Sequence, residues 1–90
     1  MYTVVFTNQF KKDLKLVERR GKHIAKLKKV LRLLASGERL PRKFMDHALT
    51  GEYRDIRECH IEPDWLLMYK IVKEQLILYA VRTGTNSDLF

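Results

Sequence analysis

The first residues of the chain form an apolar run that gives way to a helical stripe. Residues 2–6 are mostly β-branched or aromatic, which predicts a short strand. Thr7 or Asn8 can then cap a helix by accepting hydrogen bonds from its first free N–H groups. Along that helix one apolar stripe runs at positions i, i+4 and i+7, with lysines off the stripe: Phe10, Leu14 and Val17.

A second helix is predicted after Gly21, which breaks the first. Gly37 stands where a helix should stop, because glycine adopts the backbone conformation that closes a helix without steric cost. Two short helices joined at one glycine predict a helical hairpin. The apolar face of the second helix is formed by Ile24, Leu27, Val30, Leu31 and Leu34.

The rest of the chain has the composition of a loop followed by strands. Residues 38–52 are predicted to be loop, and residues 83–90 a glycine turn ending in an apolar pair. The order β-α-α-β-β-β predicts an α+β fold with an N-terminal strand and a helical hairpin packed on one face of a small antiparallel sheet. The predicted strands are 53–59, 65–71 and 75–82, with turns at 62–64 and 72–74.

Length and composition predict one domain spanning residues 1–90. The single cysteine, Cys59, allows no intramolecular disulfide and fits a reducing compartment. No stretch approaches the roughly 18 apolar residues of a membrane span, so no membrane association is expected. The first residues lack the pattern of a signal peptide, and a cytoplasmic location is therefore expected.

The positive charge is concentrated in the first half of the chain. The net charge is +7, with a balance of +10 in residues 1–43 and −3 in residues 44–90. Charge runs usually only solvate helices, but acids that would balance these two helices are scarce. The basic half therefore favours a polyanion or an acidic protein as partner.

Residues suited to acid–base chemistry gather between His47 and Trp65. Cleavage of RNA without a metal needs a base for the 2′-OH proton, an acid for the leaving 5′-oxygen and a cation for the phosphate. Histidine suits either proton role, and arginine suits the phosphate. The candidates are His47, Asp55, Arg57, Glu58, His60, Asp64 and Trp65, followed by Arg82 and the terminal Phe90.

Each candidate also has an ordinary structural explanation. The two histidines can be surface or capping residues, Asp64 a turn residue after Pro63, and Trp65 and Phe90 parts of the core. Arg82 can simply pair with Asp55 or Glu58. The pair Cys59-His60 does not indicate a metal site, because no second cysteine supplies the spacing of a zinc ligand set.

A family resemblance changes the weight of these alternatives. The run from His47 to Lys70, with its His-x-Leu-x-Gly and Arg-x-x-His-x-x-Pro-Asp elements, resembles the YafQ family of the RelE/ParE toxin superfamily. The ending from Arg82 to Phe90 resembles the family's C-terminal Arg-Thr-Gly-Thr-His-Ser-x-Leu-Phe motif. Length and element order agree as well, so the resemblance covers essentially the whole chain.

The resemblance implies a RelE-like fold and a toxin of a type II toxin–antitoxin pair. Such a toxin is an endoribonuclease (mRNA interferase) that cuts message in the ribosomal A site without a cofactor or metal. Its expected partners are mRNA, the ribosome and a cognate acidic antitoxin. Operator DNA would be bound only by the toxin–antitoxin complex.

The resemblance also implies roles for individual residues. Asp64 or His60 would be the base, Arg82 the phosphate clamp, and His47 a substrate-orienting group or proton donor. Residues expected to contact RNA are Trp65 and Phe90, which would hold the base or ribose, together with Lys70 and Arg57.

Asn86 departs from the family motif, which has a histidine at this position. An amide donates a hydrogen bond but delivers no proton, and general acid–base catalysis is worth about 10²–10⁴-fold in rate. Three explanations stay open: a naturally attenuated toxin, an acid relocated to another residue such as His47, or a substitution introduced so that a toxic protein could be produced.

Two other functions remain alternatives. One is an RNA- or ribosome-binding protein of the same family whose catalysis is attenuated, which Asn86 keeps open. The other is a ParE-like poison of DNA gyrase, which needs a binding surface but no group of histidine, aspartate and arginine side chains. The presence of His47, His60 and Asp64 argues against the gyrase poison.

Overall fold

The computed structural model describes all 90 residues and contains five strands and three helices. Short 3-10 turns lie at Arg42–Phe44, Gly51–Tyr53 and Lys73–Gln75. None of the helices has the length and apolar character needed to cross a membrane. The strands and helices are β1 (Thr3–Phe6), α1 (Asn8–Arg19), α2 (Ile24–Ala35), β2 (His47–Ala48), β3 (Arg57–Glu62), β4 (Trp65–Val72), β5 (Ile77–Gly84) and α3 (Asn86–Leu89).

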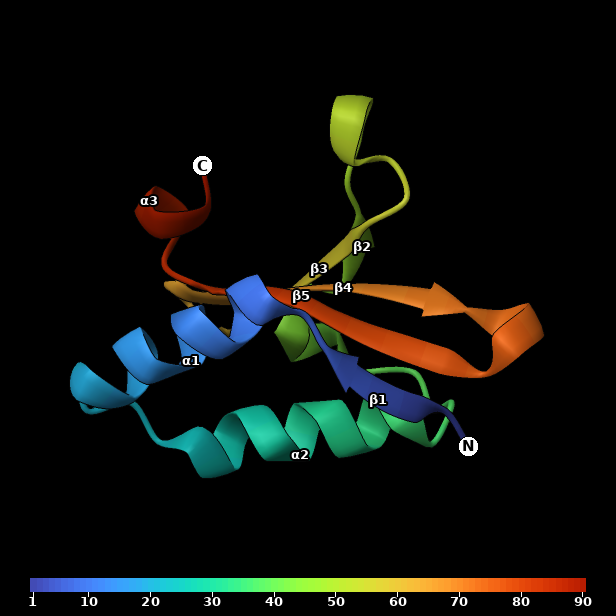
Figure 1. Ribbon diagram of the computed structural model, residues 1–90, viewed down its shortest axis with the longest axis horizontal. Coiled ribbons are helices and arrows are strands. Elements are labelled where there is room, and N and C mark those ends of the chain that lie inside the picture. The colour runs from blue at the N-terminus through green and yellow to red at the C-terminus, as the bar shows by residue number, and fades with distance from the viewer.

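All five strands belong to one sheet with the order β1-β5-β4-β3-β2. In Figure 1, α1 and α2 lie on one side of this sheet, while α3 and the turn at Gly51–Tyr53 rise from the other side. The α+β fold with a helical hairpin on one face is therefore confirmed. This arrangement leaves the second face of the sheet free of long helices.

The sheet is mixed rather than antiparallel, which corrects one detail of the predicted fold. β1 pairs in parallel with β5, whereas the pairs β2–β3, β3–β4 and β4–β5 are antiparallel. The helical hairpin carries the chain from β1, at one edge of the sheet, to β2 at the other edge. β1 therefore pairs with β5 and not with β2, the next strand in the sequence. Hydrophobic alternation indicates a strand but carries no information on its partner.

Three shorter segments also differ from the sequence prediction. The predicted loop at 38–52 contains a 3-10 turn at Arg42–Phe44 and the two-residue strand β2, which is too short to show a period. The strand predicted from residue 53 begins at Arg57, because Gly51–Tyr53 forms a 3-10 turn. The C-terminal turn is the short helix α3, capped by Thr85.

The helix ends follow the predicted signals. The Thr7 side chain caps α1 by accepting a hydrogen bond from the Phe10 N–H at 3.0 Å. After α2, Gly37 adopts a φ of 84°, the left-handed conformation expected of a glycine that stops a helix. These local signals thus confirm the start of α1 and the end of α2.

Side chains of β4 alternate between two separate apolar clusters. Trp65, Leu67 and Tyr69 point toward the helices and belong to the main core. Leu66 and Met68 point to the other face and pack with Leu89 of α3. The second face is therefore partly apolar, and the functional candidates on it surround a small core of their own.

Helix α1 also covers the edge of β5 beyond the point where β1 ends. The Thr7 hydroxyl donates to the Val81 carbonyl oxygen at 2.8 Å, and the Thr83 N–H donates to Asp13 Oδ2 at 3.2 Å. An unpaired strand edge leaves backbone groups without partners, so these contacts satisfy groups that β1 does not reach. They also fix Asp13 next to the C-terminal end of β5.

Candidate active site

The register of the sheet brings four side chains into one row on the face opposite the helices. His47 lies opposite Glu58, Glu58 opposite Met68, and Met68 opposite Arg82. Residues directly opposite one another in antiparallel strands share a face of the sheet. The first histidine and the arginine predicted from the sequence therefore lie on the same face, at opposite ends of one cross-strand row.

A β-bulge in β5 puts Arg82 on this face. Tyr69 lies opposite Ala80, but its neighbour Met68 lies opposite Arg82, so Val81 is an additional residue in β5. In a regular strand Arg82 would share the helix-covered face with Ala80, because side chains alternate with a period of two. The bulge shifts this period and leaves Val81 and Arg82 on the other face.

Arg82 is held by two hydrogen bonds to one carboxylate of α1. Its Nε and Nη2 donate to Asp13 Oδ2 and Oδ1 at 3.1 and 3.0 Å. Burial alone would raise the pKa of Asp13, but the hydrogen bonds from Arg82, Gln9 and the Thr83 N–H outweigh it and lower that pKa. The hydrogen bond to Asp13 in turn raises the pKa of Arg82, so the guanidinium stays charged.

This pairing corrects the sequence expectation that Arg82 pairs with Asp55 or Glu58. Its side chain remains 31% exposed, so part of the guanidinium still faces solvent. An arginine that is clamped on one side and open on the other is suited to bind a phosphate, because its remaining N–H groups point in a fixed direction.

His47 has a protein oxygen close to each of its ring nitrogens. Nδ1 donates to the Met45 carbonyl oxygen at 2.7 Å, and Nε2 lies 3.5 Å from Glu58 Oε1. The ring is tilted toward that of His60, with 6.5 Å between the ring centroids. The structure thus brings together the two histidines that the sequence singled out.

His60 lies on the same face, two residues along β3 from Glu58. Its Nδ1 lies 3.2 Å from the Pro63 carbonyl oxygen. A proton on Nδ1 completes this hydrogen bond and leaves Nε2 as an acceptor, the state that a general base requires.

Asp64 and Asn86 meet at the end of the sheet beyond His60. Asp64 lies in the turn between β3 and β4, exposed, and its Oδ1 accepts a hydrogen bond from the Asn86 N–H at 3.3 Å. Asn86 is the first residue of α3 and is also exposed. The residue at the family's histidine position is therefore next to the candidate carboxylate.

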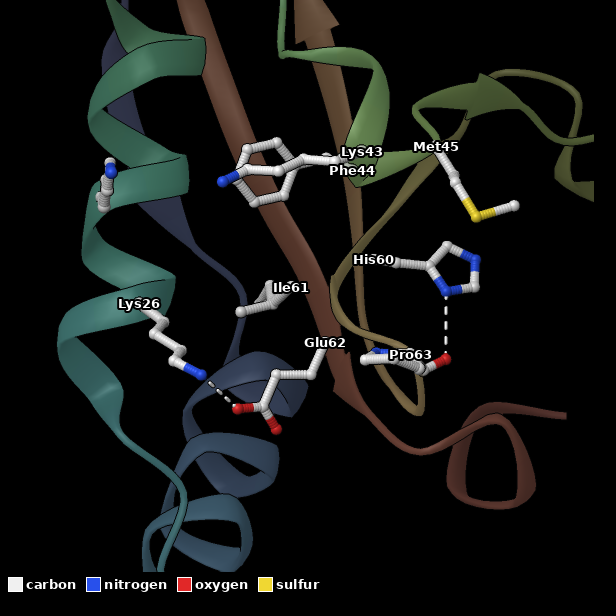
Figure 2. A pocket seen from close by; sticks show the side chains of 9 residues that line it. Lys26, Lys43, Phe44, Met45, His60, Ile61, Glu62 and Pro63 are labelled. Atoms are coloured by element: carbon white, nitrogen blue, oxygen red, sulfur yellow. Dashed lines mark hydrogen bonds and ion pairs between the residues drawn. The ribbon is translucent and has the colours of Figure 1, made fainter.

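A basic groove lies beside His60, between α2, the 3-10 turn at Arg42–Phe44 and β3. Figure 2 shows Lys26 reaching Glu62 on one side and His60 beside Met45 on the other. Lys29 and Lys43 form no ion pair, so their charges are available to an anion. The groove has a volume of about 480 Å³ and is lined by Lys26, Lys29, Lys43, Phe44, Met45, His60, Ile61, Glu62 and Pro63.

Trp65 does not belong to this surface. Its side chain points toward the helices, only 1% of the residue is exposed, and its Nε1 donates to the Thr83 hydroxyl at 2.9 Å. An enclosed indole offers no face on which a base can stack, so this geometry gives no support to the prediction that Trp65 contacts RNA. Its role is the ordinary structural one, in the core.

Arg57 is separated from the candidate site as well. It alternates with Glu58 and His60 along β3, and its guanidinium donates to both carboxylate oxygens of Asp46 at 3.3 Å. Burial opposes its charge, but the hydrogen bonds to Asp46 and Tyr69 raise its pKa. The predicted contact between Arg57 and RNA at this site is therefore not supported.

Lys70, predicted to contact RNA, lies on the open face of the sheet. It follows Met68 by two residues on β4 and lies opposite Tyr79 of β5. No ion pair engages its ammonium group, and the side chain is half-buried. Lys70 is thus placed to extend the positive charge of Arg82 along the sheet.

Phe90 is 60% exposed and forms an edge-to-face contact with Tyr53, with 6.0 Å between the ring centroids. The sequence did not identify Tyr53 as a site residue, because nothing marks it except its place after the Thr50-Gly51 turn. This contact joins the C-terminus to the turn at Gly51–Tyr53. In Figure 1 that turn rises beside β2 and β3. Exposed aromatic faces of this kind can stack on an unpaired base.

The short helix α3 is fixed by a network around Asp88. The Thr85 hydroxyl and the Asp88 carboxylate form a capping box, and Arg20, the residue after the end of α1, pairs with the same carboxylate. At Gly84 a Cβ would lie 2.9 Å from Asp88 Oδ2, so glycine is needed there. The hydrogen bond from Arg20 lowers the pKa of Asp88, and the network holds Asn86 and Phe90 at the sheet.

Taken together, these side chains can catalyse transfer of a phosphoryl group to a neighbouring hydroxyl. His60 and His47 offer two imidazoles suited to proton transfer, and Arg82 offers a fixed cation. No group of three or more His, Cys, Asp or Glu side chains is placed to hold a metal ion. The residues that sequence reasoning missed are Asp13, which carried no local signal, and Tyr53.

Comparisons with known proteins agree with this geometry. Residues 2–90 match the family described as YafQ, the bacterial toxin of a type II toxin–antitoxin system. The chain is 39% identical over 88 residues to the mRNA interferase toxin YafQ of Escherichia coli, covering 97% of this chain and 94% of that protein.

Solved structures of similar proteins share the fold over the whole chain. The crystal structure of Escherichia coli YafQ has a TM-score of 0.92 at 37% identity and covers 100% of this chain and 99% of its own. YafQ from the Escherichia coli DinJ–YafQ complex gives 0.91 at 37% identity with the same coverage. A metal-bound toxin from Helicobacter pylori gives 0.94 at 42% identity and covers both chains fully. The chain belongs to the YafQ family of bacterial toxins of type II toxin–antitoxin systems.

Proposed function

We propose that this toxin is an endoribonuclease that cleaves mRNA in the ribosomal A site. The observation that carries the proposal is the presence of His47, His60 and Arg82 on one open face of the sheet. The Escherichia coli relative is named an mRNA interferase, which supports the same reaction. Inhibition of translation follows, because a cut message cannot be read to its end.

The reaction needs only groups that this face supplies. His60 Nε2 takes the proton of the 2′-OH, and the 2′-oxygen attacks the adjacent phosphorus while the bond to the 5′-oxygen breaks. An acid returns a proton to that 5′-oxygen, so the products are a 2′,3′-cyclic phosphate and a free 5′-OH. Arg82 stabilises the crowded phosphate. Asp64 is the alternative base, since it is exposed and next to Asn86.

Substrate is held on both sides of these groups. The exposed aromatic pair of Tyr53 and Phe90 offers a stacking surface for the base next to the cut. Lys29 and Lys43 line the groove beside His60 and offer their charges to the RNA backbone. Lys70 adds a third cation on the sheet itself.

The partner that controls this activity is a cognate antitoxin. YafQ of Escherichia coli forms a complex with DinJ, which supports an equivalent complex here. The basic helices suit an acidic segment that folds on the toxin. Operator DNA would be contacted only by that complex, and the toxin would act in the cytoplasm, where message is translated.

The test is to incubate the purified protein with translating ribosomes, and separately with the same mRNA alone, and to map the new RNA ends. Discrete cuts at the ribosome with 2′,3′-cyclic phosphate ends are expected. His60→Ala should slow cutting by about 10²-fold or more. Stalled translation without cuts would instead indicate the attenuated binder, and DNA breaks dependent on gyrase would indicate the ParE-like poison.

A further inference from the structure

The 3-10 turn at Arg42–Phe44 borders a second groove as well as the one beside His60. This second groove, called the arginine groove below, has a volume of about 510 Å³. It is lined by residues 39–42 of the loop after α2 together with Met45, Asp46 and Arg57. Met45 also lines the groove beside His60, so the two grooves adjoin at this residue.

The arginine groove carries two cations without partners. Arg39 and Arg42 are exposed and take part in no ion pair. The third arginine, Arg57, is held by both carboxylate oxygens of Asp46, which is the one acid that lines the groove. An anion that enters the groove therefore meets two free guanidinium groups and no unpaired carboxylate.

The positive charge continues along both grooves. Six Lys and Arg side chains line them against the carboxylates of Asp46 and Glu62, a balance of +4 with His60 left aside. Glu62 is itself paired with Lys22 and Lys26, so neither acid is free to repel an anion. Such a row of unpaired cations favours a chain of many negative charges, because each neutralised phosphate releases counterions.

The chemistry of the track favours RNA over an acidic peptide. A guanidinium group matches two phosphate oxygens with parallel N–H donors. Met45, which is 61% exposed, offers an apolar surface to a ribose or base where the two grooves join. The candidate base, His60, lines the first groove, and a strand placed for cleavage there carries further phosphates on either side of the cut.

We propose that the arginine groove is a second RNA-binding subsite, in which Arg39 and Arg42 hold backbone phosphates some nucleotides away from the bond that is cut. This inference rests on the proposed ribonuclease function and extends it, because it makes binding depend on the length of the RNA. The strand runs from His60 past Met45 to the two arginines. The subsite reads no bases, since contacts to phosphates carry no direct sequence information.

The test removes both free guanidinium groups in Arg39→Gln/Arg42→Gln. Binding is measured with 2′-O-methyl RNA, which has no 2′-OH to attack the phosphate, in lengths of about 4 and about 12 nucleotides. The parent should bind the longer RNA more tightly, and the double variant should lose roughly 10-fold in affinity for it at about 0.1 M salt. The short RNA can bind in the groove beside His60 alone, so its affinity should fall less.

The salt dependence of binding counts the contacts that are lost. Each phosphate contact to a single strand contributes about −0.7 to the slope of log affinity against log salt concentration. The slope for the longer RNA should therefore become shallower by about 1.4 in the double variant, if each arginine binds one phosphate. In cleavage assays the loss should lie in KM rather than in kcat, because the removed groups touch neither the 2′-OH nor the phosphate that is cut.

Arg19→Gln/Arg32→Gln is the matched control. Both residues are exposed, belong to helices, form no ion pair and line neither groove. The control removes the same charge, so an effect of net charge alone would weaken RNA binding equally in the two double variants. Equal losses would overturn the subsite, and so would a parent protein that binds the two RNA lengths equally well.

The two proposals can fail separately. If the parent protein cuts no RNA, the ribonuclease function fails, while the length dependence of binding still tests the arginine groove. If the parent cuts RNA but Arg39→Gln/Arg42→Gln keeps the preference for longer RNA and the parental KM, only the subsite is overturned. A double variant that loses binding to the cognate antitoxin and keeps its RNA binding would assign the groove to the antitoxin and likewise overturn the subsite.

Discussion

The carboxylate of Asp64 accepts a hydrogen bond from the backbone N–H of Asn86, with 3.3 Å between Oδ1 and the nitrogen. This contact ties the turn between β3 and β4 to the first residue of α3. The side chain at position 86 therefore starts beside Asp64, at the edge of the face that carries His60. A histidine here would be close to the candidate site, whereas asparagine offers only an amide.

Asn86→His tests how much the missing histidine matters. If His47 already supplies the proton, the substitution should change single-turnover cleavage by less than about 10-fold in the parent protein. A gain of 10² or more would mean that the chain with Asn86 lacks an effective acid.

Phe90→Ala should weaken substrate binding without destabilising the fold. The ring is mostly exposed, and a base stacked on an aromatic side chain is worth about 1–3 kcal/mol, so cleavage at low RNA concentration should fall by roughly 10-fold or more. Unfolding in urea should change by less than about 0.5 kcal/mol. Tyr53→Phe, which keeps its ring, is the matched control, and equal losses in both variants would contradict stacking.

Trp65→Phe, in contrast to Phe90→Ala, should destabilise the fold and leave cleavage by the folded protein nearly unchanged. Its indole is enclosed in the core and donates to Thr83, whose hydroxyl donates onward to the Leu66 carbonyl oxygen. A smaller ring without the N–H should lower the free energy of unfolding by about 1–3 kcal/mol. Cleavage by the folded variant should stay within a few-fold of the parent, measured well below its melting temperature. A loss of activity with unchanged stability would return Trp65 to the substrate site.

Local signals in the sequence predicted the helices well but said little about which strands pair. The Thr7 cap and Gly37 mark helix ends within a few residues, because capping depends on neighbours in the chain. The parallel pairing of β1 with β5 depends on where the helical hairpin delivers the chain, and no local pattern records that. The strand β2 has only two residues, too few to show the alternation of apolar and polar positions that predicts a strand.

The same distinction applies to the candidate site. His47, His60 and Asp64 could be named because a motif spans them, and the register of the sheet then explains why they lie together. Trp65 belongs to that motif too, yet the alternation of β4 turns it toward the helices. Asp13 could not be foreseen as the partner of Arg82, since the contact depends on a bulge at Val81 and on α1 covering the edge of β5.

The ion pair between Asp13 and Arg82 should make the protein less stable in acid. The pKa of Asp13 lies below its ordinary value of 3.8 in the folded protein, so its contribution is fully present above about pH 4 and is lost as the pH falls through the folded pKa. The pKa values of Glu62 and Asp88 are lowered by their basic partners and add a loss of the same sign.

Asp13→Asn isolates the contribution of the buried carboxylate. The side chain keeps its shape but loses its charge, which should lower the free energy of unfolding at pH 7 by about 1–3 kcal/mol. The loss is not larger because Arg82 is partly exposed and can be solvated by water when its partner is neutral. Urea unfolding at pH 7 and pH 3 should show the difference from the parent shrinking in acid, as the parent carboxylate takes up its proton. Asp55→Asn, at an exposed residue without an ion pair, should leave both values near those of the parent. A difference that stays constant between pH 7 and pH 3 would show that the charge of Asp13 contributes nothing to the fold.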